Sequence, residues 1–206
     1  MFLFTPSHST PLSVQSCFCL RPHRLLAALF AALLAGCVSV KSVDRDELPS
    51  AWTKSLPKPD ATPCDPSGTY ISTGQGVKSA DTLESRDLGN VFFPGQRIRA
   101  TQWELRHDAA VHLLTVTATA GRNRGTTATF PTELDAKTHA LHVPKIEVLG
   151  TKFGATVETQ SARLLVGDDR ALYIETKRVA GGVVLFVPAV GYWKNWGRWE
   201  LATPTP

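Results

Sequence analysis

Between Cys64 and Leu201 the chain consists of short runs with β character, separated by turn signals at spacings near ten residues. In Thr101–His107 the apolar Trp103 and Leu105 alternate with polar residues, and in Val111–Ala120 threonines alternate with apolar residues. A period of two is typical of strands with one buried and one solvated face. We therefore expect an all-β domain, an antiparallel meander of about 8–10 strands that forms a barrel, a curled sheet or a sandwich.

The other runs that we interpret as strands share this pattern or lie between turns: Gly68–Ser72, Val91–Phe93, Thr126–Phe130, Ala140–Leu149, Gly154–Thr159, Ala162–Val166, Ala171–Val179 and Val183–Val187. Turns are expected at Arg122–Gly125, Gly167–Arg170 and Ala180–Gly182, where Gly, Asn or Asp tolerates the backbone conformations of turns. One short helix is expected around Thr82–Leu88. Because parallel strands need crossover helices, which this chain lacks, we do not expect a Rossmann-like or hydrolase-type sheet.

Eleven apolar residues, Leu25–Ala35, lie between a basic group at Arg21–Arg24 and the tetrapeptide that ends at Cys37. A spanning helix needs about 20 residues, whereas a basic flank, a short apolar run and small residues form a secretory signal peptide. A buried helix of a cytosolic domain is the alternative, which the flank and the tetrapeptide together disfavour. Leu34-Ala35-Gly36-Cys37 resembles the lipobox of bacterial lipoproteins, in which the cysteine receives a diacylglyceryl group and becomes the new N-terminus.

This resemblance implies that residues 1–36 are a signal peptide and that Cys37 is the lipid anchor. Val38 stands where an Asp commonly retains lipoproteins in the inner membrane, so the resemblance implies the periplasmic face of the outer membrane. The inner membrane and the cell surface are the alternatives. Stable anchoring takes two or more acyl chains, since one chain binds only marginally. The expected partners are the membrane, through the N-terminal lipid, and a protein of the envelope.

Residues 38–63 are polar and interrupted by prolines, without apolar periodicity beyond Trp52 and Leu56. We expect residues 37–63 to be a flexible tether that carries a β-barrel-like domain at 64–206. The alternative is that Trp52 folds back onto the domain or lies at the membrane surface.

Composition excludes two further classes of protein. Without residues 1–36 the chain has 20 basic and 18 acidic residues, interspersed along its length. This small net positive charge does not indicate a nucleic-acid-binding surface. Cys64 is then the one cysteine besides Cys37, so the domain forms no internal disulfide. Cys64 is expected to be a buried free thiol or an intermolecular partner.

No motif for catalysis stands out. His107 and His112 flank a four-residue loop and could form a weak metal or acid–base pair, or a loop-edge pair without a role, but no third ligand can be named. His139 and His142 would point to opposite faces of a strand. The sequence also lacks a Gly-x-Ser-x-Gly elbow. We therefore expect no enzyme activity, no metal and no cofactor.

Arg122 and Arg124 form the most distinct polar patch, at a predicted hairpin tip. Two guanidiniums could bind a phosphate of a lipid or lipopolysaccharide, or a carboxylate of the cell wall. A solvated loop is the alternative.

Gly68-Thr69-Tyr70 near the start of the domain and Trp193, Trp196, Arg198 and Trp199 near its end are similar to the pattern of lipocalins and calycins. In that family an aromatic ring on the first strand packs against an arginine from the end of the barrel. The resemblance implies a lipocalin-like barrel in which Tyr70 packs against Arg198, with Trp199 beside them. Such a cation–π closure contributes about 0.5–2 kcal/mol.

Together these features predict a non-enzymatic, membrane-anchored lipoprotein with a role in envelope structure or assembly. The first alternative is a lipocalin-like carrier that holds a lipid or another apolar molecule in the barrel. The second is an envelope hydrolase or metalloenzyme.

Overall fold

The structure, a computed structural model, describes residues 37–58, 65–77, 86–120, 123–147, 156–184 and 187–202. This part of the chain is mostly β, as the sequence predicts. Its strands are β1 (Cys37–Ser42), β2 (Gly68–Ile71), β3 (Gln75–Gly76), β4 (Gln102–Asp108), β5 (Leu113–Ala120), β6 (Asn123–Pro131), β7 (Glu133–Leu134), β8 (Leu141–Glu147), β9 (Thr156–Val166), β10 (Leu172–Val184) and β11 (Val187–Trp199). Its helices are η1 (Arg45–Glu47), α2 (Ser50–Ser55) and α3 (Leu88–Phe92).

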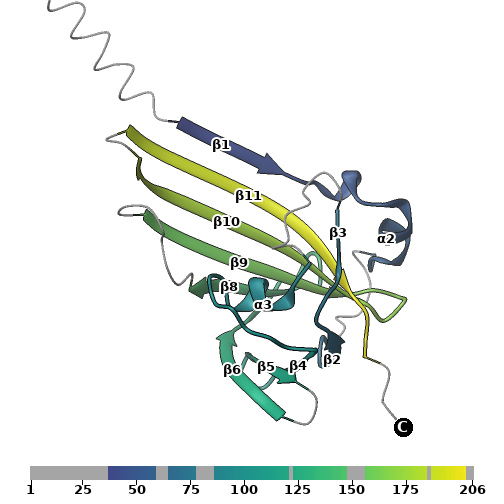
Figure 1. Ribbon diagram of the computed structural model, residues 1–206. Coiled ribbons are helices and arrows are strands. Elements are labelled where there is room, and N and C mark those ends of the chain that lie inside the picture. Colours follow the sequence, from purple (N-terminus) through teal and green to yellow (C-terminus); the bar gives the residue numbers. More distant parts are fainter. Residues whose placement is uncertain are drawn as a thin grey trace, which may run out of the picture. The chain divides into compact units, whose positions relative to one another are not determined.

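The larger sheet, sheet A, has the strand order β1-β11-β10-β9-β8-β7, and β3 also pairs with β11. Figure 1 shows β9, β10 and β11 as long neighbouring strands with β1 along the edge. Most neighbours are antiparallel, but β1 is parallel to β11. The sheet is therefore mixed, because β1 runs in the same direction as the last strand of the chain.

The smaller sheet, sheet B, is an antiparallel meander of order β2-β4-β5-β6. Its strands show the expected alternation. Trp103, Leu105 and Val116 are buried on one face, while Thr115 and Thr129 lie on the opposite face with their hydroxyl oxygens 3.4 Å apart. One face of sheet B therefore packs in the core and the other meets solvent.

The main core contains side chains of both sheets and of α3. On sheet A it is lined by Leu172, Ile174 and their neighbours, and we call this side of sheet A the inner face. Phe93, directly after α3, stacks on Trp103 of sheet B with ring centroids 5.5 Å apart. Closely packed aliphatic and aromatic side chains thus form the core between the two sheets.

The two sheets are joined along one side by the residues that follow β11. The amide of Ile71 donates to the carbonyl oxygen of Glu200 at 3.1 Å, and the amide of Ala202 donates to that of Thr69 at 2.8 Å. The first strand of sheet B, β2, is therefore hydrogen-bonded to the residues that follow β11, a contact expected if the first and last strands of the domain close the sheet. The described strands nevertheless form two separate sheets, so they do not make a closed barrel.

The structure differs from the expected tether over residues 37–58. Cys37–Ser42 is a strand of sheet A, and the residues after it pack on the outer face of this sheet, opposite the main core. The ring of Trp52 meets that of Tyr173 edge-on, with centroids 5.8 Å apart. The alternative in which Trp52 folds back onto the domain is therefore the one observed. The second core contains Val43, Leu48, Trp52, Leu56, Val77, Ala140, Leu165, Ala171, Tyr173 and Trp196.

Several local predictions also differ from the structure, among them the turn at Arg122–Gly125, since Asn123–Gly125 belong to β6. Val91–Phe93, interpreted as a strand, belongs largely to the helix α3. Asp87 is the N-cap of this helix, and its carboxylate accepts a 2.8 Å hydrogen bond from the amide of Gly89. Ala180–Gly182, interpreted as a turn, lies within β10, where the ladders to β9 and β11 extend the strand. The predicted strands Gly154–Thr159 and Ala162–Val166 belong to the single strand β9 over its described residues.

Candidate functional site

Cys37 is the first residue of β1 and is paired with Ala189 of β11. The parallel ladder continues without interruption to the pair Ser42 and Lys194, and the amide of Val43 extends it with a 3.0 Å hydrogen bond to the carbonyl oxygen of Lys194. A lipid on Cys37 would therefore be joined directly to the edge of sheet A. No flexible spacer separates the expected anchor from the fold in this part of the chain.

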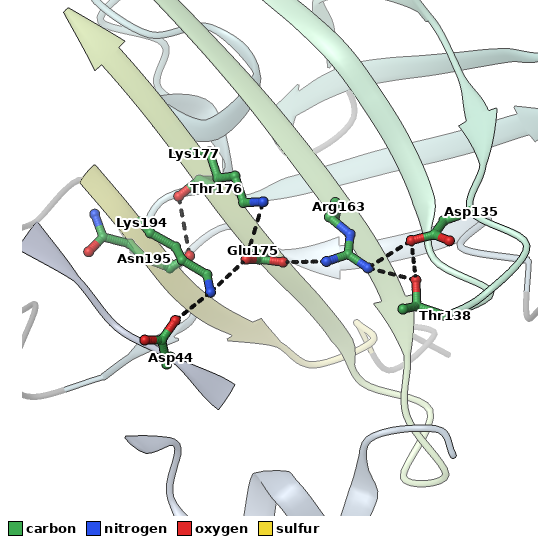
Figure 2. Close-up of polar contacts among 9 residues, drawn as sticks. All are labelled: Asp44, Asp135, Thr138, Arg163, Glu175, Thr176, Lys177, Lys194 and Asn195. Atoms are coloured by element: carbon green, nitrogen blue, oxygen red, sulfur yellow. Dashed lines mark hydrogen bonds and ion pairs between the residues drawn. The ribbon is translucent and has the colours of Figure 1, made fainter. Parts of the chain in front are cut away.

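A row of charged side chains crosses the outer face of sheet A (Figure 2). Its central member is Glu175 on β10, whose side chain is only 2% exposed. Arg163 on β9 lies 3.0 Å from one of its carboxylate oxygens, and Lys194 on β11 lies 3.2 Å from the other. Three cations thus surround one buried carboxylate, since the amine of Lys177 is also 4.0 Å away.

Both ends of this row are tied to connecting segments. At one end Lys194 donates a 2.7 Å hydrogen bond to Asp44, just after β1. At the other end Arg163 donates to Asp135 at 3.1 Å and to the hydroxyl of Thr138 at 2.6 Å. We call Asp44, Lys194, Lys177, Glu175, Arg163 and Asp135 the charged row.

The electrostatics of the row favour its charged form. Hydrogen bonds from the Thr138 hydroxyl and the Lys137 amide lower the pKa of Asp135 from 3.8 to about 2. Partial burial alone would lower the pKa of Lys194, but the carboxylates of Asp44 and Glu175 outweigh it and raise the pKa. Each charged group has a partner of opposite sign, an arrangement that suits a structural network rather than an acid–base pair.

An open groove of about 410 Å³ lies beside the row and is lined by Glu133, Leu134, Asp135, His142, Arg163 and Lys177. Nδ1 of His142 is 3.8 Å from a carboxylate oxygen of Glu133. The groove therefore offers charges of both signs to a polar partner.

A second cavity brings together three of the histidines. His107, His112 and His139 line a pocket of about 250 Å³ with Asp65, Pro66, Ala109, Leu134 and Leu141. Nδ1 of His107 is 3.9 Å from Asp65, and its Nε2 is 3.5 Å from the hydroxyl of Thr132. Nδ1 of His139 is buried and has no hydrogen-bond partner.

The sequence suggests His107 with His112, and it places His139 and His142 on opposite faces of a strand. His139 lies instead in the turn before β8, where its φ of 52° is in the left-handed region, as is that of His112 at 54°. The residue that marks this turn in the sequence is Asp135, whose carbonyl oxygen accepts a 2.8 Å hydrogen bond from the amide of His139. Within the described residues, no group of three or more His, Cys, Asp or Glu side chains is arranged to hold a metal ion. The histidines of the pocket can offer hydrogen bonds to a ligand, and Leu134 and Leu141 can offer apolar contacts.

Of the residues of the predicted closure, Tyr70 is on β2 of sheet B, whereas Arg198 and Trp199 are neighbours on β11 of sheet A. Tyr70 and Trp199 are both buried in the main core. Arg198 is on the outer face, with its guanidinium 5.9 Å from the ring centroid of Tyr173. The expected packing of Arg198 against Tyr70 is thus replaced by packing against Tyr173, because neighbouring residues of a strand point to opposite faces.

Arg198 also binds Asp169, with 3.0 Å between Nη2 and the carboxylate. Burial alone would raise the pKa of Asp169, but hydrogen bonds from Arg198 and from the hydroxyl of Tyr173 lower it. This cluster holds the turn between β9 and β10 against the end of β11.

Three residues singled out in the sequence have no described side chain. Arg122 and Cys64 lie outside the described residues, and only the backbone of Arg124, in β6, is described. The predicted anion contact and the state of the thiol stay predictions.

Comparison of the chain with protein-family models, with curated proteins and with solved structures gives no match. None of the helices in the described part of the chain has the length and apolar character needed to cross a membrane.

Proposed function

We propose that the protein is a non-enzymatic lipoprotein of the bacterial envelope, anchored by lipid on Cys37 and acting in envelope structure or assembly through protein contacts. The motif Leu34-Ala35-Gly36-Cys37, after a basic flank and a short apolar run, supports the anchor. Val38 supports the periplasmic face of the outer membrane as the location.

The observation that carries the structural role is the pairing of Cys37 with Ala189. An anchor joined directly to a sheet holds the domain close to the membrane and limits the directions in which it can turn. A carrier or an enzyme that meets soluble partners gains from a flexible spacer. A rigid attachment suits a protein that presents a surface at a set height above the membrane.

The edge of β1 is the surface that best fits a protein partner. β1 is the end strand in the order of sheet A, so one of its edges is not paired with another described strand. An extended segment of a partner can add to such an edge through backbone hydrogen bonds.

The test of the anchor is Cys37→Ser in the full chain, with labelled fatty acid as the probe. We expect the substitution to abolish labelling and to release the protein from salt-washed membranes. Cys64→Ser is the matched control, because Cys64 is the other cysteine after residue 36 and should not affect labelling. Retention of label in the Cys37→Ser protein would overturn the proposal.

A small-molecule carrier is the second candidate, and the pocket of His107, His112 and His139 favours it. The buried, unpartnered Nδ1 of His139 offers a ligand a hydrogen bond, and Leu134 and Leu141 offer apolar contact. Native mass spectrometry of the protein purified from its own membrane should then detect a bound small molecule that is lost in His139→Leu.

A further inference from the structure

Exposed valines gather on the outer face of sheet A near Cys37. Val40 is 65% exposed, Val190 49% and Val179 42%. Val40 and Val179 are both register partners of Tyr192, from opposite sides of β11, and Val190 lies two residues before Tyr192 on that strand. Paired residues share a face and residues two apart on a strand share one too, so the three valines form one surface, the valine patch.

The valine patch lies at the level of the expected anchor. Val190 is the register partner of Val38, the residue after Cys37, and Val40 is three residues from Cys37. At about 3.3 Å per residue, Val40 is then about 10 Å along the strand from Cys37. The headgroup layer of a bilayer is roughly 5–8 Å thick on each side. Acyl chains on Cys37 would therefore bring the patch to the headgroup layer or its border.

The charges beside the patch do not account for a contact with an anionic surface. Lys177 and Lys194 lie on this face farther along the same strands, and both face the buried carboxylate of Glu175. Lys194 is also bonded to Asp44. Because these cations are compensated within the protein, removal of apolar surface from water is the force that the patch can supply.

We propose that the valine patch lies in the interfacial layer of the membrane that holds the acyl chains of Cys37. The inference rests on the proposed anchor and adds a second contact, which keeps sheet A in one orientation at the membrane. Lipidated proteins in general bind stably when a second signal supplements an acyl chain. The partner is the zwitterionic phospholipid surface itself.

The experiment uses the full lipidated protein in phosphatidylcholine vesicles, with an environment-sensitive fluorophore attached at Val190→Cys in a Cys64→Ser background. The matched control carries the fluorophore at Val111→Cys, because Val111 is 57% exposed and lies between β4 and β5 of sheet B. Phospholipids that bear a spin label on the headgroup are the quencher. We expect quenching at position 190 to exceed that at position 111 by about threefold or more, independently of salt.

Equal quenching at the two positions, in protein whose mass shows lipid on Cys37, overturns the inference and leaves the anchor intact. Self-quenching at position 190 that disappears when labelled protein is diluted with unlabelled protein shows that a second copy covers the patch, and this also overturns it. Protein without lipid on Cys37 overturns both the anchor and the membrane contact.

Discussion

Glu175 and Arg163 form an ion pair across β10 and β9, with 3.0 Å between Nη1 and the carboxylate, although the Glu175 side chain is only 2% exposed. A buried carboxylate costs free energy unless cations and hydrogen bonds compensate it. Arg163 and Lys194 provide this compensation from the two neighbouring strands, and their outer partners Asp135 and Asp44 lie beyond the strands themselves. The charged row thereby fixes two connecting segments on the outer face of sheet A.

Glu175→Gln should lower the free energy of unfolding by about 2 kcal/mol, which is less than for a fully buried pair because Arg163 and Lys194 retain some exposure to water. Urea denaturation measures the change. Glu104→Gln is the control, since Glu104 pairs with the exposed Arg106 and should change stability by less than about 1 kcal/mol. Equal effects of the two substitutions would show that the charged row has no special role in stability.

Trp52→Ala should lower the free energy of unfolding by about 3–5 kcal/mol, because the Trp52 ring is buried in the second core against Tyr173. Lys54→Ala in the same helix is the control, since its side chain is exposed. A thermal melt of each variant distinguishes a folded segment from a tether. If Trp52→Ala melts at the same temperature as the parent protein, residues 50–55 do not pack as described.

Gly167→Ala should destabilise the protein by about 1–3 kcal/mol. An added Cβ would lie 2.7 Å from both the carbonyl oxygen of Ser55 and the ring of Tyr173. Gly181→Ala in β10 is the matched control, because nothing lies within 4 Å of its added Cβ, and its stability should stay within about 0.5 kcal/mol of the parent. A larger loss for Gly181→Ala than for Gly167→Ala would contradict the packing of α2 against this turn.

The free energy of unfolding should fall in acid, partly because Asp135 becomes protonated. Its pKa is lower in the folded protein, at about 2, than the ordinary value of 3.8, so its stabilisation is complete above pH 4 and is lost as the pH falls toward 2. Asp135→Asn should therefore be less stable than the parent at pH 6, and the gap should narrow by pH 3. Urea midpoints at the two pH values measure it. If the difference in stability between Asp135→Asn and the parent is the same at both pH values, the charge of Asp135 does not contribute to stability.

The fold class was predictable because apolar residues alternate with polar residues along β4 and β5, although Thr117 of β5 is buried as well. Residues 37–58 were not predictable in the same way. Of their buried side chains only Trp52 lies within a helix or strand, in α2, whereas Val43, Leu48 and Leu56 lie in the connections, so no single regular element presents them as one face. The glycines at 181 and 182 suggest a turn, but the ladders on both sides keep β10 extended through them. In each case distant partners decide the local conformation.

Of the candidate site, sequence identified the possible anchor but not the groupings in space. His107 and His112 are close in the chain, so the sequence suggests them as a pair, whereas His139 joins them only through the packing of one sheet against the other. Arg198 was expected beside Tyr70, and its actual partner Tyr173 follows from the register of β10 and β11. Register sets which face a side chain meets, and no local pattern in this chain specifies it.

Trypsin digestion of membrane-extracted protein, followed by mass spectrometry of the N-terminal peptide, tests the central claim most directly. We predict a peptide Cys37–Lys41 whose N-terminal residue is Cys37 and whose mass is raised by a diacylglyceryl group or by a further acyl chain as well. Detection instead of the unmodified peptide Leu25–Lys41, which keeps Gly36 joined to Cys37, would contradict the account.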